Sequence, residues 1–178
     1  MNRRELAADI DAACRLSGKF TLRSGLTSDE YFDKYLFESD PKLLRRVAEA
    51  MVSLIPRGTD LLGGLELGGV PLATVVSQLN GLPTLFVRKR AKEYGTERLA
   101  EGVIDIAGRR VTLIEDVITT GGAVRQAALS LRAQGAEVAS VVCAIDRSDG
   151  LPSALDDVAI SVHPVLRRSD LDAVHQEG

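Results

Sequence analysis

The sequence has 178 residues, which is enough for one domain with a sizeable hydrophobic core. Hydrophobic residues make up 45% of the chain and charged residues 26%, as is typical of a soluble globular protein. The formal net charge of −3 does not favour nucleic acid as a partner. The sequence shows no secretory signal and no apolar run long enough to span a bilayer, so we expect no membrane contact and a cytoplasmic location.

The two cysteines, Cys14 and Cys143, lie in apolar patterns, and we expect both to be buried thiols of a reducing compartment. The two histidines, His163 and His175, lie outside every motif discussed below, and we assign them no functional role. The sequence shows neither a Ser/His/Asp set nor a His/Cys metal-binding spacing.

The first part of the chain predicts two helices separated by a polar, aromatic segment. Residues 2–17 show the apolar spacing of an amphipathic helix, with Gly18 as its stop. Residues 19–37 appear irregular or short-stranded. Asp40 and Pro41 are a typical N-cap and first residue of a second helix.

From residue 56 onward, short apolar runs alternate with helical patterns, which predicts an α/β fold with a parallel sheet. The expected strands cover residues 60–64, 84–88, 111–116, 137–145 and 158–162. The expected helices cover residues 70–79 and 122–134, with a last short helix beginning after the N-cap Ser169. The long polar segment 89–105 interrupts this alternation, and a loop of that length is usually functional or disordered.

The segment 111–124 is the most informative part of the sequence. An apolar strand ends in Glu115 and Asp116, and a turn with two threonines and two glycines leads into a helix. Backbone N–H groups at such a helix start bind phosphate, while the carboxylates suit sugar hydroxyls or Mg²⁺ held through water. The segment therefore predicts a site for a phosphorylated ribose, although two adjacent carboxylates alone would equally well begin a polar loop. It is neither a Walker A loop nor a Rossmann fingerprint.

A cationic run follows the second expected strand. Arg88, Lys89, Arg90 and Lys92 fall within five residues of a chain that is acidic overall. Most charge runs are solvated surface. This run instead enters the long loop that contains Gly95 and Gly102, so we expect a mobile loop that neutralises a polyanion and closes over it.

The segment 63–71 contains four glycines within seven residues, between an expected strand and an expected helix. Such glycines let the backbone approach a ligand or adopt an unusual peptide conformation. We favour a second anion-binding loop over a flexible connector.

Two further segments suit a flat, anionic ring. Residues 20–34 combine aromatic side chains with cations, which is also compatible with ordinary core packing. Arg147 follows the fourth expected strand, where it can grip a carboxylate through two parallel hydrogen bonds or form a structural salt bridge.

These five segments, in this order, resemble the type I phosphoribosyltransferases. Residues 18–33 and 88–95 are more specific and resemble the branch of that family that acts on orotate. The resemblance implies one domain over residues 1–178, with a mostly parallel sheet flanked by helices, an N-terminal hood (about residues 1–40) and a mobile catalytic loop (residues 88–105). It implies transfer of the 5-phosphoribosyl group from phosphoribosyl pyrophosphate (PRPP) to orotate, which gives orotidine 5-monophosphate and pyrophosphate in pyrimidine (UMP) biosynthesis.

The resemblance also assigns site residues. Contacts with PRPP fall on Arg23, Arg88, Lys89, Lys92, Tyr94, Glu115, Asp116, Val117, Ile118, Thr119, Thr120, Gly121, Gly122 and Ala123. Contacts with orotate fall on Tyr31, Phe32, Thr119 and Arg147, and catalytic roles on Arg88, Lys89, Lys92 and Asp116. Mg²⁺ would be the cofactor, held mainly by PRPP and water without a direct protein ligand. The catalytic loop would reach the neighbouring subunit's site, which implies a homodimer.

The chain departs from the family pattern at three places. Glu115 stands where Asp is commoner, Tyr94 where many relatives have His, and Leu67-Gly68 where a Tyr-Lys pair is usual. The last change removes one cation from the pyrophosphate loop.

Two other functions fit parts of the pattern. A type I transferase for a purine base would leave Arg147 and the aromatic pair Tyr31-Phe32 without a reason. A PRPP sensor without activity would not need the cationic loop.

Overall fold

The structure, a computed structural model, describes residues 2–21, 25–89, 99–103, 105–148 and 155–176. Its main sheet has six strands in the order β5-β4-β3-β6-β7-β8, and neighbouring strands are parallel except for β4 and β5. The strands are β3 (Leu61–Leu65), β4 (Thr84–Val87), β5 (Ala100–Glu101), β6 (Arg110–Ile118), β7 (Glu137–Asp146) and β8 (Ser161–Arg167). The expected α/β class with a mostly parallel sheet is confirmed.

The strand order creates a switch point between β3 and β6. The chain leaves β3 toward β4 and β5 on one side and returns to β6 on the other side of β3. In open α/β sheets, ligands bind at the carboxyl ends of the strands at such a point. The loops that follow β3 and β6 are therefore where a site is expected.

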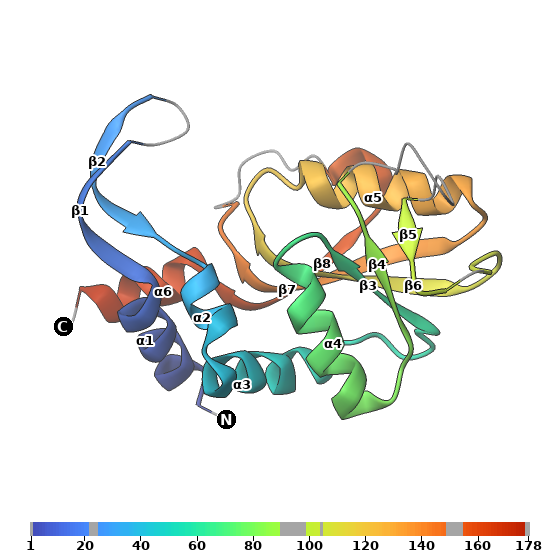
Figure 1. The fold of residues 1–178 in the computed structure, drawn as a ribbon, viewed down its shortest axis with the longest axis horizontal. Helices are drawn as coiled ribbons and strands as arrows, with labels where there is room; N and C mark the ends of the chain where they lie inside the picture. The colour runs from blue at the N-terminus through green and yellow to red at the C-terminus, as the bar shows by residue number, and fades with distance from the viewer. Residues whose placement is uncertain (1, 22–24, 90–98, 104, 149–154, 177–178) are drawn as a thin grey trace.

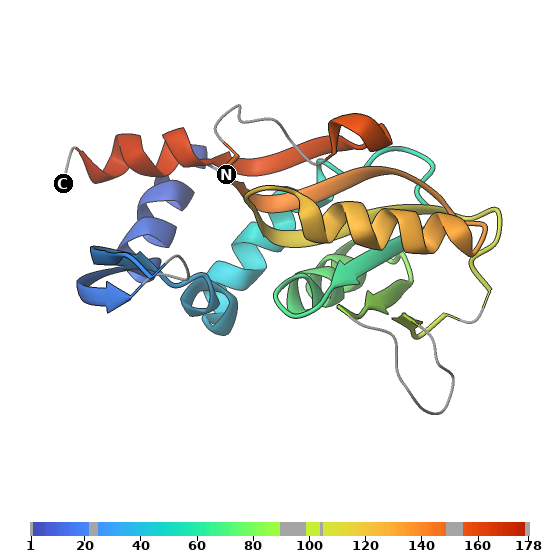
Figure 2. The ribbon, with the colours of Figure 1, turned by 90° about the horizontal axis from the view of Figure 1, so that it is seen from above.

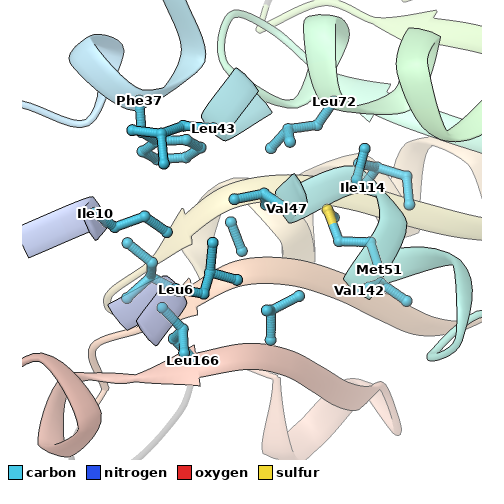
Figure 3. Packing of buried hydrophobic residues seen from close by; sticks show 14 of the residues in the cluster. Leu6, Ile10, Phe37, Leu43, Val47, Met51, Leu72, Ile114, Val142 and Leu166 are labelled. Carbon is cyan, nitrogen blue, oxygen red and sulfur yellow. The ribbon is translucent and has the colours of Figure 1, made fainter. Parts of the chain in front are cut away.

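Helices cover both faces of the sheet. Helix α5 (Gly122–Ala133) lies on one face, while α3 (Pro41–Val52) and α4 (Gly69–Asn80) lie on the other (Figure 1). Side chains alternate along β6, so Leu113 packs in the core beneath α5 and Ile114 in the core beneath α3 and α4. Figure 3 shows the second core, where Val47, Leu72 and Ile114 meet.

The N-terminal segment extends this second core. Helix α1 (Arg3–Cys14), the short α2 (Tyr35–Ser39) and the C-terminal α6 (Arg168–His175) contribute buried side chains to it. Between α1 and α2, strands β1 (Arg15–Thr21) and β2 (Thr27–Phe32) form an antiparallel hairpin. The hairpin projects from the helical layer (Figures 1 and 2). No helix in the described part of the chain is long and apolar enough to cross a membrane.

Several element ends differ from the expectations. Helix α1 ends at Cys14 rather than residue 17, because Arg15 already pairs with Phe32 in the hairpin. Strand β6 continues to Ile118 instead of ending at Asp116, because β7 pairs with it up to Asp146. The last expected strand, at 158–162, is β8 in the structure and covers residues 161–167. His163 therefore lies within β8.

The last helix does not use Ser169 as its N-cap. Helix α6 begins at Arg168, and the Arg167 N–H donates to the Asp170 carboxylate at 2.6 Å. The N-cap predicted for α3 is confirmed, since Asp40 accepts from the N–H groups of Lys42 and Leu43 at 2.8 and 2.9 Å.

Candidate active site

The two carboxylates of the main motif lie inside strand β6 and not at its end. Glu115 is 8% exposed and Asp116 is fully buried. The pairing between β3 and β6 ends at Gly64–Ile114. Beyond that point the two carboxylates accept from the backbone of β6: Glu115 accepts from the Asp116 N–H at 3.0 Å, and Asp116 from the Val117 N–H at 2.5 Å.

Asp116 is also the centre of a charged cluster on the α4 side of the sheet. The ammonium of Lys34 forms an ion pair with Asp116 Oδ2. Glu38, from α2, lies close to the same carboxylate, and the two acids interact electrostatically. Gly68 lies against both acids, since a Cβ there would collide with Asp116 and come within 2.6 Å of Glu38 Oε1.

The sequence analysis missed Lys34 and Glu38 as site residues. Lys34 belongs to the aromatic and cationic segment 20–34, so a signal was present, but it pointed toward the base and not toward Asp116. Glu38 carries no local signal, because its place beside Asp116 depends on how α2 packs against the sheet.

The cluster holds protons at neutral pH. Burial and a hydrogen bond to Asp116 raise the pKa of Glu38 to about 8 and that of Glu115 to about 9. Burial alone would also raise the pKa of Asp116, but hydrogen bonds from Glu115 and Lys34 outweigh it and lower this pKa. Glu38 Oε1 is buried without a donor among the described residues, and a proton on Glu38 lets this group donate to Asp116. At pH 7 the cluster is therefore a Lys34–Asp116 ion pair flanked by two neutral acids.

The turn after β6 has the geometry expected of a phosphate cradle. Thr119 and Thr120 are exposed, and Gly121 adopts a left-handed conformation (φ 77°) immediately before α5. The first N–H groups of a helix have no intrahelical acceptor, and they form the positive end of the helix dipole. The exposed first turn of α5, at Gly122 and Ala123, therefore offers N–H groups to an anion.

The glycine-rich segment divides between strand and loop. Gly63 and Gly64 lie within β3, where Gly64 packs so closely against Ala73 that a Cβ would come within 2.8 Å. The loop itself is Glu66 to Gly68, and the Glu66–Leu67 peptide bond is cis. Part of the expected anion-binding loop is therefore a packed strand.

The described start of the cationic run borders a pocket of about 570 Å³. Arg88 and Lys89 line one side of this pocket, and Ala123 and Gln126 of α5 line another. The Lys89 N–H donates to Glu66 Oε2 at 2.9 Å, which ties the run to the β3–α4 loop. The lining does not include Glu115 or Asp116, so the pocket lies beside the acidic pair and not over it.

The two aromatic residues expected at the orotate ring separate in the hairpin. Tyr31 is 43% exposed and stacks near Phe20, with ring centroids 5.4 Å apart. Phe32 instead lies beneath Arg147, whose guanidinium carbon is 5.3 Å from the ring centroid. Adjacent residues of a strand point to opposite faces, so Phe32 meets Arg147 and Tyr31 does not.

Arg23, Lys92 and Tyr94, to which the resemblance assigned roles, lie outside the described residues. The described residues contain no group of three or more acidic, His or Cys side chains able to hold a metal ion. The predicted burial of Cys14 and Cys143 is confirmed, and it raises the pKa of both thiols, to about 11 for Cys14.

Comparison with known proteins agrees with this geometry. Residues 37–162 match the phosphoribosyl transferase domain family. The chain is 69% identical over 173 residues to the orotate phosphoribosyltransferase of Nocardioides sp., which covers 97% of this chain and 96% of the relative.

Two crystal structures of orotate phosphoribosyltransferase from Mycobacterium tuberculosis H37Rv share the fold. The complex with Fe(III) dicitrate has a TM-score of 0.82 and 31% identity, and covers 95% of this chain and 98% of that one. The complex with PRPP has a TM-score of 0.78 and 28% identity, and covers 96% and 98%.

The fold and the acidic strand with its phosphate turn thus define a phosphoribosyltransferase of type I. Within that class, the chain belongs to the orotate phosphoribosyltransferase family.

The protonated cluster predicts a pH-dependent stability. In the unfolded chain Glu38 and Glu115 would titrate near 4.5, so from that pH up to 8–9 the folded state binds more protons than the unfolded state. Their contribution is complete below about pH 4.5 and is lost as the pH rises to about 9. Asp116, whose pKa is lowered, contributes stability that is lost only in more acidic solution. Its contribution is therefore constant between about pH 4.5 and about pH 9.

Glu38→Gln should reduce the slope of the free energy of unfolding against pH. The reduction is at most about 1.4 kcal/mol per pH unit, which is the value for one proton. Urea unfolding between about pH 5 and about pH 9 measures the slope. Glu49→Gln is the matched control, because Glu49 is an exposed residue of α3 paired with Arg45. A Glu38→Gln protein that loses stability as steeply as the wild type would contradict the assignment.

The phosphate turn predicts a specific need for glycine at position 121. A Cβ there would lie 2.9 Å from Leu155 Cγ, in addition to the left-handed strain of about 1–2 kcal/mol. Gly121→Ala should displace the first turn of α5 and weaken binding of ribose 5-phosphate by about 10-fold or more, as measured by calorimetry. Gly81→Ala is the control, since Gly81 has φ 78° at the end of α4 and open space around its Cβ position. Equal losses of affinity in the two variants would show that strain alone is responsible.

Proposed function

We propose that this chain transfers the 5-phosphoribosyl group of PRPP to orotate, giving orotidine 5-monophosphate and pyrophosphate. The observation that carries the proposal is the position of Arg147 beside the acidic pair and the phosphate turn. Ile118 pairs with Asp146, and the Arg147 N–H donates to Ile118 O at 2.8 Å. The backbone of Arg147 therefore lies beside the start of the phosphate turn, and its guanidinium, which lies over Phe32, suits a carboxylate.

The base site combines charge with an apolar ring. Arg147 lies over Phe32, so a flat ligand there meets a guanidinium and an aromatic face. Orotate has both a planar ring and a carboxylate, whereas the purine bases have no carboxylate for Arg147 to grip. The base specificity follows from this pairing.

The ribose site follows from β6 and α5. The turn from Thr119 to Ala123, which is exposed except at Gly121, would receive the 5-phosphate, and Glu115 and Asp116 would face the ribose hydroxyls. Each carboxylate accepts a hydrogen bond from the backbone N–H of the following residue, which fixes its orientation. The ribose is thereby oriented before reaction, which lowers the entropic part of the barrier.

In the reaction, N1 of orotate loses its proton and forms a bond to C1 of PRPP as the bond from C1 to pyrophosphate breaks, and the proton leaves with the pyrophosphate or to solvent. Positive charge develops on the ribose ring and negative charge on the leaving group. Arg88, Lys89 and Lys92 would stabilise the leaving pyrophosphate by charge. Closure of the loop over residues 88–105 would keep water from C1.

Mg²⁺ is the proposed cofactor, and the donor groups of the site suit an ion held mainly by PRPP and water. Glu115 and Asp116 are engaged with backbone N–H groups, and Asp116 also with Lys34, so neither presents a free carboxylate as a direct ligand. When bound, the ion would neutralise charge on the pyrophosphate. The reaction belongs to pyrimidine biosynthesis, and we place it in the cytoplasm.

The direct test is the ultraviolet absorbance of orotate on mixing with the protein, PRPP and Mg²⁺. We expect the orotate band to decrease only when all components are present. Adenine, hypoxanthine and guanine are the alternative bases, and turnover of one of them without orotate turnover would refute the base assignment. Binding of PRPP without turnover of any base would identify a sensor instead of an enzyme.

We further propose a homodimer in which each catalytic loop serves the neighbouring site. Lys92→Ala should reduce turnover by roughly 10²- to 10³-fold if this lysine acts as a preorganised charge. Asp116→Asn damages the ribose site in the body of the same subunit. Mixed dimers of the two variants contain one site with both an intact body and an intact loop if the loop acts on the neighbour.

Unfolding and refolding an equal mixture should therefore restore about a quarter of the wild-type activity by statistical pairing. Each variant refolded alone is the control. Absence of restoration, with mixed dimers verified by mass spectrometry, would show that the loop acts within its own subunit.

A further inference from the structure

The loop between β3 and α4, residues 66–68, contains no lysine or arginine. The proposed substrate would bring its pyrophosphate to this loop. PRPP carries the 5-phosphate and the 1-pyrophosphate at opposite ends of the ribose. If the 5-phosphate lies at the turn after β6 and the ribose over Asp116, the pyrophosphate points across the switch point toward Glu66–Gly69. The charged side chain in this loop is Glu66, and its Oε2 already accepts the Lys89 N–H.

Position 68 cannot supply the missing charge. A side chain on Gly68 would collide with Asp116 and with Glu38, as described above. The neighbouring Gly69 is equally constrained, because a Cβ there would collide with the carbonyl oxygen of Ile114. The close contact between this loop and β6 therefore excludes a lysine at positions 68 and 69.

Lys34 brings a cation to the same point from the N-terminal hood. Its ammonium pairs with Asp116 Oδ2, the oxygen against which Gly68 packs. The side chain of Lys34 remains 33% exposed, whereas that of Asp116 is 1% exposed, so the exposed part of this ion pair belongs to Lys34. It also lies 5.3 Å from the centroid of the Tyr35 ring, which helps to hold it in place.

The chemistry of the ammonium suits a second, anionic partner. An ammonium has three donors, and Asp116 cannot use all of them. The acids beside it, Glu38 and Glu115, do not add negative charge at pH 7, as the cluster above shows. An incoming phosphoryl group therefore meets a cation compensated by one carboxylate, and not an excess of negative charge.

We propose that Lys34 binds the pyrophosphate group of PRPP and thereby replaces the cation that the β3–α4 loop lacks. The proposal rests on the proposed function for the identity of the ligand. It makes the N-terminal hood part of the pyrophosphate site as well as of the base site.

The test compares ligands that do and do not carry a pyrophosphate. Calorimetry on the full chain measures binding of pyrophosphate, PRPP and ribose 5-phosphate to the wild type, Lys34→Gln and Lys34→Arg. Lys34→Gln should weaken pyrophosphate and PRPP binding by about 10- to 100-fold, the effect of one charge-assisted hydrogen bond. It should weaken ribose 5-phosphate binding by a clearly smaller factor, which reflects only the loss of the partner of Asp116. Lys34→Arg should retain most of the affinity, and Lys42→Gln, an exposed lysine of α3, should match the wild type.

Two results would overturn the proposal. A parallel loss of ribose 5-phosphate binding in Lys34→Gln would show that Lys34 acts only by orienting Asp116. Unchanged affinity for all three ligands would show that it does not contact the substrate.

A measurement on the wild-type protein covers the case in which Lys34→Gln does not fold. The acetylation rate of Lys34, followed by mass spectrometry, should fall when pyrophosphate is present and stay the same with ribose 5-phosphate. Equal rates with and without pyrophosphate would refute the proposal.

The experiments distinguish failure of the Lys34 proposal from failure of the proposed transferase function. Orotate turnover by the wild type combined with unchanged pyrophosphate affinity in Lys34→Gln would refute this inference alone. Weakened pyrophosphate binding in a protein without orotate turnover would support the anion site and refute the transferase.

Discussion

The arrangement of this site depends on one buried carboxylate, that of Asp116, near the carboxyl end of the interior strand β6. A charge without exposure to water is unfavourable unless it is paired and hydrogen-bonded. Asp116 obtains its cation from Lys34, a residue more than eighty positions earlier in the chain, and a hydrogen bond from the backbone of Val117. The N-terminal segment is therefore held to the catalytic edge of the sheet by the residue that would face the ribose.

The other unusual features of the cluster follow from this pair. The ion pair satisfies one negative charge, so Glu38 and Glu115 are accommodated as neutral acids, which their raised pKa values reflect. Asp116 and Glu38 fill the space next to position 68, where only a glycine fits without a collision. The loop therefore carries no cation at position 68, and the cation at this point of the structure is Lys34 from the N-terminal segment.

The comparison of sequence and structure shows which features have a local cause. The alternation of strands and helices, the Asp40 cap and the turn at Gly121 were predictable, because each depends on residues close in sequence. The continuation of β6 to Ile118 was not, since it is stabilised by pairing with β7. The cluster of Lys34, Glu38 and Asp116 was not predictable for the same reason, because it forms only when the N-terminal segment packs against the sheet.

The end of the hairpin brings the N-terminal segment into contact with two neighbouring strands of the sheet. Phe32 is the last residue of β2 and lies against Arg147 at the end of β7, while Lys34, two residues later, lies against Asp116 in β6. Between them, the Asp33 N–H donates to the Cys14 carbonyl at 2.8 Å and fixes this segment to the end of α1. A segment of three residues thereby spans the edges of two neighbouring strands. Because its backbone is fixed at the centre, a displacement of the hairpin would move the base contact and the charge on Asp116 together.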